Sequence, residues 1–255
     1  MFIARIPALR TIALILIASS GYAAGVPEGC GQLLVGVAPA WNSMRGQLRW
    51  FTRGPGGEWT PEGGPIPVLF GKNGLAWGSG LEGQNESGLR KKERDGRAPA
   101  GVFRIGKIYT YDARLPAGAN YPFHQVTTAD AWIDDVNHPD YNRFVRIKDP
   151  ANPPPWFEKQ KMRHNDFAYR WLVDVRHNSD PPVAGDGSAI FFHIRRGVDR
   201  PSAGCTTMAE SNLVQLIKWL RAERRPCYVL LPAKEYEEKW RSWRLPSPEL
   251  ASSNR

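Results

Sequence analysis

The sequence of 255 residues predicts a mainly β fold with a few helices. Three short runs of aliphatic and aromatic residues predict strands in the first third of the chain, at 32–37, 47–51 and 66–70. Glycine and proline cluster between these runs, which is typical of the turns that connect strands. A chain of this length is sufficient for one large domain or two small ones, with a substantial core.

The remaining elements combine strands with short helices. A strand is expected over 102–111, after the polar and charged segment 83–96, which we interpret as a solvated loop. Residues 156–164 suit a short amphipathic helix, and the alternating pattern of 167–175 predicts a core strand. The C-terminal part predicts a helix that ends near Glu223, a strand over 227–231 and a last helix over 234–240.

One stretch carries the residues with the clearest chemical potential. The apolar run 189–192 predicts a buried strand that ends at His193, and Cys205 follows it after a basic loop. Thr207 and Glu210 have the spacing of a capping box, which predicts a helix that begins directly after Cys205. The positive end of that helix would favour the thiolate form of Cys205, and His193 would hold the proton in an ion-pair-like arrangement.

Cys205 and His193 therefore form a candidate nucleophile and base. Gly204 would let the backbone approach a substrate carbonyl closely, and the amides around Cys205 could form an oxyanion hole. The structural alternatives are a buried packing cysteine and a satisfied core histidine.

At these residues the sequence resembles the catalytic domain of L,D-transpeptidases, the YkuD or ErfK family. The family signature is a strand-borne His followed by Ser-x-Gly-Cys, and His193, Ser202, Gly204 and Cys205 match it. The resemblance implies a Greek-key-like β-sandwich or open barrel with a few peripheral helices. It also implies that no cofactor is required.

An upstream segment adds to the resemblance. Residues 92–103 are similar to the family's Asp-x-x-Thr-Pro-x-Gly segment, with Ala98 in place of the Thr. With this segment the similar region runs roughly from Leu33 to Pro232. The chain departs from the family in having Ile194 where a Gly often follows the His. It has Thr207 where an Arg or Asn is common.

The resemblance implies acyl transfer from a peptidoglycan tetrapeptide stem, through a thioester on Cys205, to an amine acceptor. His193 would act as acid and base. A partner on its other ring nitrogen should orient the ring; the sequence does not identify this partner, for which a backbone carbonyl is our candidate. The remaining candidate contacts to the stem peptide or its oxyanion are Ser202, Gly204, Thr206, Arg195, Arg196 and Trp132. Arg195, Arg196 or Arg200 could replace the charge of the missing family arginine.

The segment 116–155 is irregular and rich in aromatic residues. One interpretation is a cleft wall, in which Trp132 and Tyr141 contact peptide and Asp134 or Asp135 meets an amine. An ordinary loop stapled by aromatic residues and Asx turns is the alternative. No metal site is expected, because no diagnostic ligand spacing is present.

Two other functions remain open at this point. With water as acceptor, the same Cys and His site would belong to an L,D-carboxypeptidase or a peptidoglycan hydrolase, since acceptor choice depends on cleft shape and water exclusion. A protein of a different class, a non-catalytic cell-wall-binding protein, would keep Cys205 buried and inert.

The chain begins with the pattern of a secretory signal peptide over residues 1–24. Arg5 and Arg10 precede an apolar run, and small residues up to Ala24 suit cleavage. An uncleaved anchor is the alternative. We expect a periplasmic or extracellular protein with no membrane span after cleavage. A catalytic domain is expected over 30–245, with a disordered tail over 246–255.

The chain is basic, with a net charge of +9 that becomes 9 − 2 = +7 after loss of the two signal arginines. A basic exported protein suits the anionic cell wall. Nucleic-acid binding is disfavoured, because the positive residues are scattered and no nucleic-acid motif is present. The expected partners are peptidoglycan stem peptides, and we expect a monomer.

Three cysteines leave one unpaired in an oxidising compartment. If Cys205 is the nucleophile, Cys30 and Cys227 remain as a potential disulfide that ties the ends of the domain together. Two unpaired buried cysteines are the alternative, and sequence alone does not decide between them.

Overall fold

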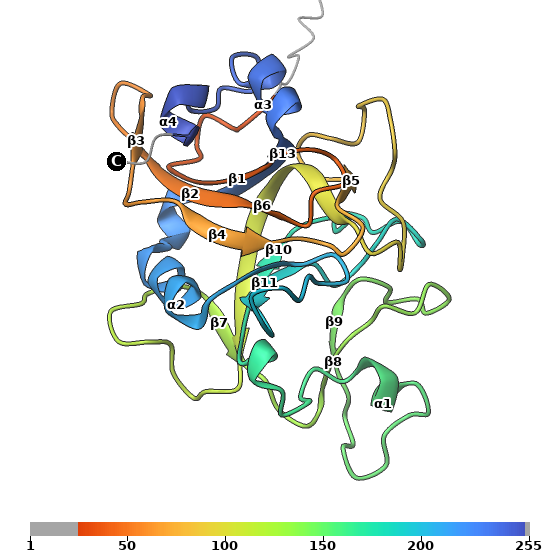
Figure 1. Cartoon of the computed structure of the whole chain (residues 1–255). Coiled ribbons are helices and arrows are strands. Elements are labelled where there is room, and N and C mark those ends of the chain that lie inside the picture. The colour runs from red at the N-terminus through yellow and green to blue at the C-terminus, as the bar shows by residue number, and fades with distance from the viewer. Residues whose placement is uncertain (1–24, 253–255) are drawn as a thin grey trace, which may run out of the picture.

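The computed structural model describes residues 25–252. The predicted signal peptide and the last three residues lie outside the described residues. The predicted mainly β fold is confirmed, with helices at the periphery of a large sheet (Figure 1). Within the described residues, no helix has the length and apolar character needed to cross a membrane.

Eight strands close the sheet into a barrel. Each strand pairs with the next in the order β1-β13-β6-β10-β11-β12-β4-β2, and antiparallel pairing of β2 with β1 completes the circle. The predicted alternatives of a sandwich or an open barrel thus resolve into a closed barrel. Its strands are β1 Gln32–Ala38, β2 Arg45–Arg53, β4 Ile66–Leu69, β6 Ala98–Thr110, β10 Trp171–Val175, β11 Phe191–Ile194, β12 Thr206–Met208 and β13 Cys227–Pro232.

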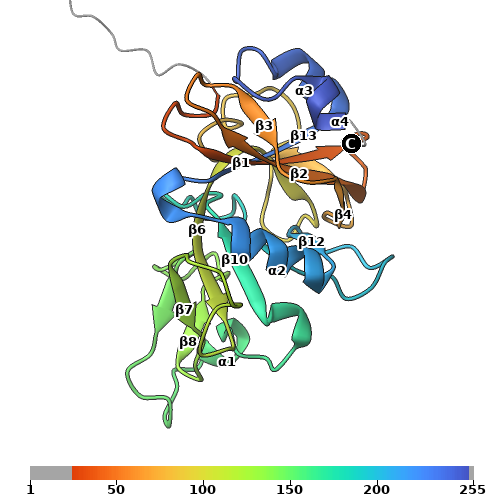
Figure 2. The ribbon, with the colours of Figure 1, turned by 90° about the vertical axis from the view of Figure 1, so that its left-hand side faces the viewer.

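Shorter elements extend this barrel. Strand β3 pairs with β2, while β5 and β7 pair with β6; β8 and β9 form a separate ribbon that lies below the barrel beside α1 (Figure 2). These elements are β3 Trp59–Pro61, β5 Leu75–Trp77, β7 Phe123–Gln125, β8 Asp130–Trp132, β9 Phe144–Arg146, α1 Phe157–Gln160, α2 Glu210–Trp219, α3 Ala233–Lys239 and α4 Pro248–Ser252. Two 3-10 turns complete the set, η1 Phe167–Tyr169 and η2 Ala222–Arg224.

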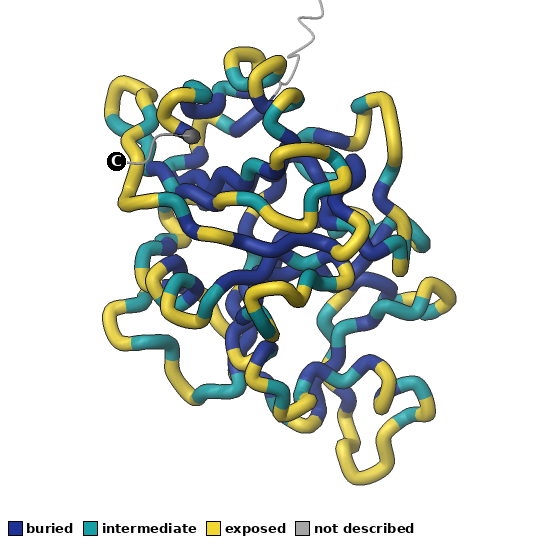
Figure 3. Tube along the Cα trace, in the orientation of Figure 1, coloured by how far each residue is buried: buried dark blue, intermediate teal, exposed yellow. Residues whose placement is uncertain are grey.

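The core fills the barrel interior. Buried segments run through the central strands, and exposed segments are concentrated in the connecting loops (Figure 3). Aromatic side chains provide much of the bulk, because each buries a large apolar area. The largest fully buried side chains are Trp77, Tyr228, Phe51, Phe70, Phe103 and Phe192.

The structure differs from the predicted elements at several places. The helix expected over 156–164 covers only α1, and α2 ends at Trp219 and not near Glu223. The strand expected over 167–175 begins only at Trp171, because the Asp166 side chain accepts a hydrogen bond from the Ala168 amide and starts a 3-10 turn instead. The helix expected directly after Cys205 begins at Glu210, since Thr206–Met208 pairs with β11 and β4 as β12. Residues Pro248–Ser252 form α4, in a segment for which we expected disorder.

Cys30 and Cys227 lie side by side in the core. Both are buried free thiols that interact with each other, and the Cys30 thiol donates to the Gln32 carbonyl at 3.1 Å. The parallel pairing of β1 with β13, in which Leu33 is the partner of Cys227, brings them together. The proximity that a disulfide would need is therefore present, although the bond is not formed.

We predict that this pair oxidises when the mature protein is isolated from an oxidising compartment. Denatured, unreduced protein should then offer a single alkylatable thiol, and its mass should be lower than that of reduced protein by the two lost hydrogen atoms. Reduction should lower the free energy of unfolding by about 2–4 kcal/mol, because the closed loop is long. Three alkylatable thiols in unreduced protein would contradict this prediction.

Candidate active site

The parallel pairing of β11 with β12 brings His193 and Cys205 to the same face of the sheet. His193 is the register partner of Thr207, and Cys205 precedes Thr207 by two residues. Because side chains alternate along a strand, Cys205, Thr207 and His193 all project from one face. The sequence analysis expected the strand to end at His193, but β11 continues to Ile194.

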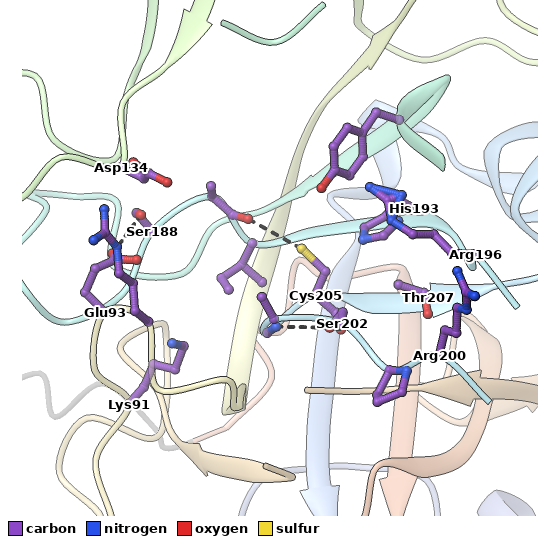
Figure 4. A pocket seen from close by; sticks show the side chains of 17 residues that line it. Lys91, Glu93, Asp134, Ser188, His193, Arg196, Arg200, Ser202, Cys205 and Thr207 are labelled. Atoms are coloured by element: carbon purple, nitrogen blue, oxygen red, sulfur yellow. Dashed lines mark hydrogen bonds between the residues drawn. The ribbon is translucent and has the colours of Figure 1, made fainter. Parts of the chain in front are cut away.

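Both side chains line one cavity of about 410 Å³. Figure 4 shows ionisable groups on both sides of the Cys205 thiol. Lys91, Glu93 and Asp134 are on one side, and His193, Arg196 and Arg200 are on the other. A second cavity of about 170 Å³ adjoins it, with Cys205, Ala189, Tyr169 and Asp134 in both linings. Cys205 therefore lies where the two cavities meet.

Cys205 is a neutral thiol at rest. Its Sγ donates to the Ala189 carbonyl at 3.5 Å and accepts from the Phe191 amide at 3.4 Å. Burial raises the pKa of Cys205 to about 11, although the Phe191 amide and the Lys91 charge act in the opposite direction. The prediction that a helix N-terminus favours the thiolate form of Cys205 is wrong, because β12 separates Cys205 from the start of α2.

His193 is held as a neutral base. Burial lowers the pKa of His193 to about 4, with a further contribution from the nearby positive charge of Arg196. In the neutral form, its Nδ1 lies 2.9 Å from the Ile194 carbonyl and donates to it, so Nε2 is the nitrogen available to accept a proton. The backbone carbonyl expected to orient the ring is therefore that of Ile194.

Cys205 and His193 share the cavity but do not form the predicted ion pair. No hydrogen bond joins them in the described part of the chain, since the thiol is turned toward Ala189. Ala189 itself has a positive φ of 52°, and its amide donates to the buried Asn142 side chain at 3.0 Å. This uncommon backbone conformation directs the Ala189 carbonyl at the sulfur.

The resting thiol leads to a prediction for alkylation. With a pKa of about 11, the rate of Cys205 alkylation by iodoacetamide should rise about tenfold per pH unit from pH 7 to pH 10, because only the thiolate reacts. Peptide mapping by mass spectrometry separates Cys205 from the two core cysteines. A rate that levels off below pH 8 would show a resting thiolate and contradict the prediction.

Ser202 and Gly204 shape the loop that presents Cys205. The Ser202 hydroxyl donates to the Cys205 carbonyl at 2.5 Å and accepts from the Gly204 amide at 3.0 Å. A side chain at Gly204 would bring its Cβ to 2.9 Å from the Arg97 carbonyl, so glycine lets the loop pack there. The Gly204 amide is therefore occupied, and the Cys205 amide is the one without an acceptor within residues 25–252.

The other predicted contacts are only partly brought together. Arg196 lines the main cavity, where it pairs with Asp166 at 2.6 Å and stacks on Tyr169. Trp132 lines the adjoining cavity. Arg195 lines neither cavity, and the buried Thr206 hydroxyl is paired with the Tyr228 hydroxyl at 3.0 Å. Arg195 and Thr206 are therefore not positioned to contact a substrate in these cavities.

The sequence analysis missed Lys91 and Glu93. The Lys91 side chain is 4% exposed, and its ammonium donates to Asp95 at 2.7 Å. Asp95 also accepts from the amides of Lys92 and Arg97, at 2.8 Å each, so the acidic residue of the upstream segment fixes this loop. Both residues lie in a charged segment of the sequence. Such segments usually face solvent, so the sequence analysis did not consider them as cavity residues.

Glu93 belongs to a polar cluster in the cavity wall. Its carboxylate accepts from the Ser188 hydroxyl at 2.7 Å and from the Tyr141 hydroxyl. Thr207 lies in the same cavity, and its buried hydroxyl has no hydrogen-bond partner within the described residues. No group of three or more His, Cys, Asp or Glu side chains in residues 25–252 is arranged to hold a metal ion.

The fold and cavity define a closed β-barrel domain that presents a loop cysteine and a strand histidine to one site. Residues 59–229 match the model of the L,D-transpeptidase catalytic domain, YkuD. This match covers well over half of the chain, so the protein belongs to the YkuD family. No curated protein and no solved structure matches the chain.

Proposed function

We propose that the protein is an exported, cysteine-dependent peptidoglycan L,D-transpeptidase. The observation that carries the proposal is that His193 on β11 and Cys205, directly before the parallel strand β12 of a YkuD domain, line a single open cavity. The predicted signal peptide supports export to the periplasm or the cell exterior. Peptidoglycan stem peptides are the partners on which the YkuD family acts.

The first step forms a thioester. As a stem tetrapeptide binds, the Cys205 thiol turns from Ala189 and gives its proton to Nε2 of His193, and the thiolate attacks the carbonyl at the L-centre of the third residue. The Cys205 amide can donate to the oxyanion that develops. The amide C–N bond then breaks, and the leaving D-Ala amine takes the proton from His193.

The second step resolves the thioester. An amine of a neighbouring stem peptide attacks the thioester carbonyl and gives a proton to His193. The C–S bond then breaks, and His193 passes this proton to the Cys205 sulfur, which restores the thiol. The two cavities that meet at Cys205 support separate approach of acyl donor and amine acceptor. Attack by water in place of the amine would give the carboxypeptidase product.

The leaving residue must lie on the His193 side of the thiol, because His193 protonates its amine. Arg196 and Arg200 lie on this side (Figure 4). Arg196 is already paired with Asp166, whereas no carboxylate of the described residues pairs with Arg200. Arg200 is therefore the cation best placed to bind the terminal carboxylate of the departing residue, in place of the missing family arginine.

We predict that Arg200→Gln lowers kcat/KM about 5- to 20-fold for a donor with a free terminal carboxylate, as expected for loss of one charge-assisted hydrogen bond. A donor amidated at that carboxylate should react poorly with both proteins, and its kcat/KM should be similar for the unmodified protein and for Arg200→Gln. Arg195→Gln is the matched control, because Arg195 lies outside both cavities. Equal losses with both donors would contradict this role for Arg200.

Muropeptide analysis tests the proposed function. Purified mature protein and Cys205→Ala are each incubated with disaccharide-tetrapeptides, and the products are identified by mass spectrometry. Cross-linked dimers formed with release of D-Ala, only by the unmodified protein, are the expected result. Tripeptide monomers alone would assign a carboxypeptidase. No reaction would favour a non-catalytic wall-binding protein.

A further inference from the structure

A separate groove runs along β6 and β10. Its main part is a cavity of about 650 Å³ that shares no lining residue with the Cys205 cavity. A second hollow of about 390 Å³ continues it, with Arg104, Arg176 and Asp180 in both linings. The two parts adjoin at these shared residues, so together they can hold a ligand of several linked units.

The floor of this groove contains a buried carboxyl group that has one ion pair and no hydrogen bond within the described residues. The Asp174 side chain is 6% exposed, and no described residue forms a hydrogen bond with it. Its nearest cation, Arg176 Nη1, is 3.8 Å away. A Cβ on Gly106 would lie 2.0 Å from Asp174 Oδ2, so the strand opposite accommodates the carboxyl through a glycine. Burial raises the pKa of Asp174 to about 7.

Burial of a carboxyl group that makes no hydrogen bond is costly, and the cost falls when a ligand supplies one. Asp174 lines the cavity, so a ligand hydroxyl in the groove can reach it. Tyr109 lines the same cavity, and no hydrogen bond to its hydroxyl is present within residues 25–252. The floor therefore offers hydrogen-bonding groups to a ligand rich in hydroxyl groups.

The rim is positively charged. Arg104, Lys107 and Arg225 are exposed and line the groove, and no carboxylate of the described part of the chain pairs with them. Asp180, the other acidic residue of the groove, is held by Arg176, whose Nη2 lies 2.8 Å from both carboxylate oxygens. Cations around an acidic floor favour a ligand whose negative charges are separated by neutral hydroxyl groups.

We propose that this groove binds a strand of an anionic glycan. Sugar hydroxyls would occupy the floor at Asp174 and Tyr109, and carboxylates on the sugars would pair with Arg104, Lys107 and Arg225. A nucleic acid fits less well, because its phosphates are closely spaced along the chain and a carboxyl on the floor would oppose them. The site shares no lining residue with the Cys205 cavity, and it would hold the protein on glycan segments whose sugar carboxylates carry no stem peptide.

Isothermal titration with the mature protein tests the proposal. The probe is a peptide-free oligosaccharide of alternating N-acetylglucosamine and N-acetylmuramic acid, whose lactyl carboxylates are free. Chitotetraose is the comparison ligand, because it has N-acetylhexosamine units without carboxylates. We expect the anionic glycan to bind at least about tenfold more tightly, and its affinity to fall with salt.

Variants locate the site. Arg104→Gln with Lys107→Gln should weaken binding of the anionic glycan about tenfold or more. Asp174→Val, which keeps the side-chain shape, should weaken it about tenfold without lowering the melting temperature, since it removes a buried carboxyl. Lys148→Gln is the matched control, an exposed lysine outside the groove, and should bind normally.

Four results would overturn the proposal, of which the first three concern glycan binding. They are equal binding of chitotetraose and the anionic glycan, binding that the Arg104, Lys107 and Asp174 variants leave unchanged, and absence of glycan binding by folded protein at millimolar probe. Tighter binding of a single-stranded oligonucleotide at the same groove would assign the site to nucleic acid instead.

Discussion

Replacement of Cys205 by alanine is expected to reduce turnover of tetrapeptide donors by at least about 10³-fold, because the covalent intermediate can no longer form. The side chain is half-buried and packs at the edge of a small cluster with Phe191 and Ala189. Loss of its sulfur should therefore lower the free energy of unfolding by only about 1 kcal/mol. Thermal melting and muropeptide turnover of the same preparation measure both effects.

The matched control for this variant is Cys205→Ser, which keeps a hydroxyl in the same loop. It should fold normally and show no more than trace turnover, since an alcohol is a weaker nucleophile without a strong base. Full turnover by either variant would remove Cys205 from the role of nucleophile. Loss of turnover together with a large drop in melting temperature would point to a structural role instead.

Replacement of His193 by alanine should lower kcat/KM about 10²- to 10⁴-fold, the usual range for loss of a general acid and base. The acidic limb of the unmodified enzyme's kcat/KM profile should lie near pH 4, because burial lowers the pKa of His193 to about that value. The imidazole must be neutral to accept the thiol proton. It is neutral above pH 5 and becomes charged as the pH falls through 4.

His138→Ala is the control for this change, because His138 packs on Trp156 and lines neither cavity. Its kcat/KM should remain within about twofold of the unmodified enzyme. The role of His193 as a neutral base would be contradicted if the kcat/KM profile of the unmodified enzyme had its acidic limb near pH 6.5. Normal acylation by His193→Ala would contradict it as well. Pre-steady-state release of D-Ala measures acylation directly.

The sequence predicts the barrel strands well, because their signal is local. Apolar runs between glycine and proline clusters identify β1, β2, β4 and β13 to within one or two residues at most ends. Helix α2 begins later than its capping-box pattern indicates. Thr206–Met208 gains backbone pairing with both β11 and β4, and that tertiary pairing prevails over the local preference of Thr207 for a cap.

The candidate site was only partly predictable for a related reason. Cys205 and His193 are recognised by residue type and order, but their mutual geometry depends on side-chain orientation and burial. Burial also reverses the expected charge states, since it leaves a neutral thiol and a neutral imidazole where an ion pair was expected. Glu93 reaches the cavity through Ser188, a residue 95 positions away, and no local pattern encodes such a contact.

The most direct test of the account is the intact mass of the protein after rapid mixing with a tetrapeptide donor and an acid quench. The account predicts a transient adduct with the mass of the donor less D-Ala, located on the Cys205 peptide and absent from Cys205→Ala. Release of D-Ala from unmodified protein with no adduct at any time, or with an adduct on another residue, would contradict it.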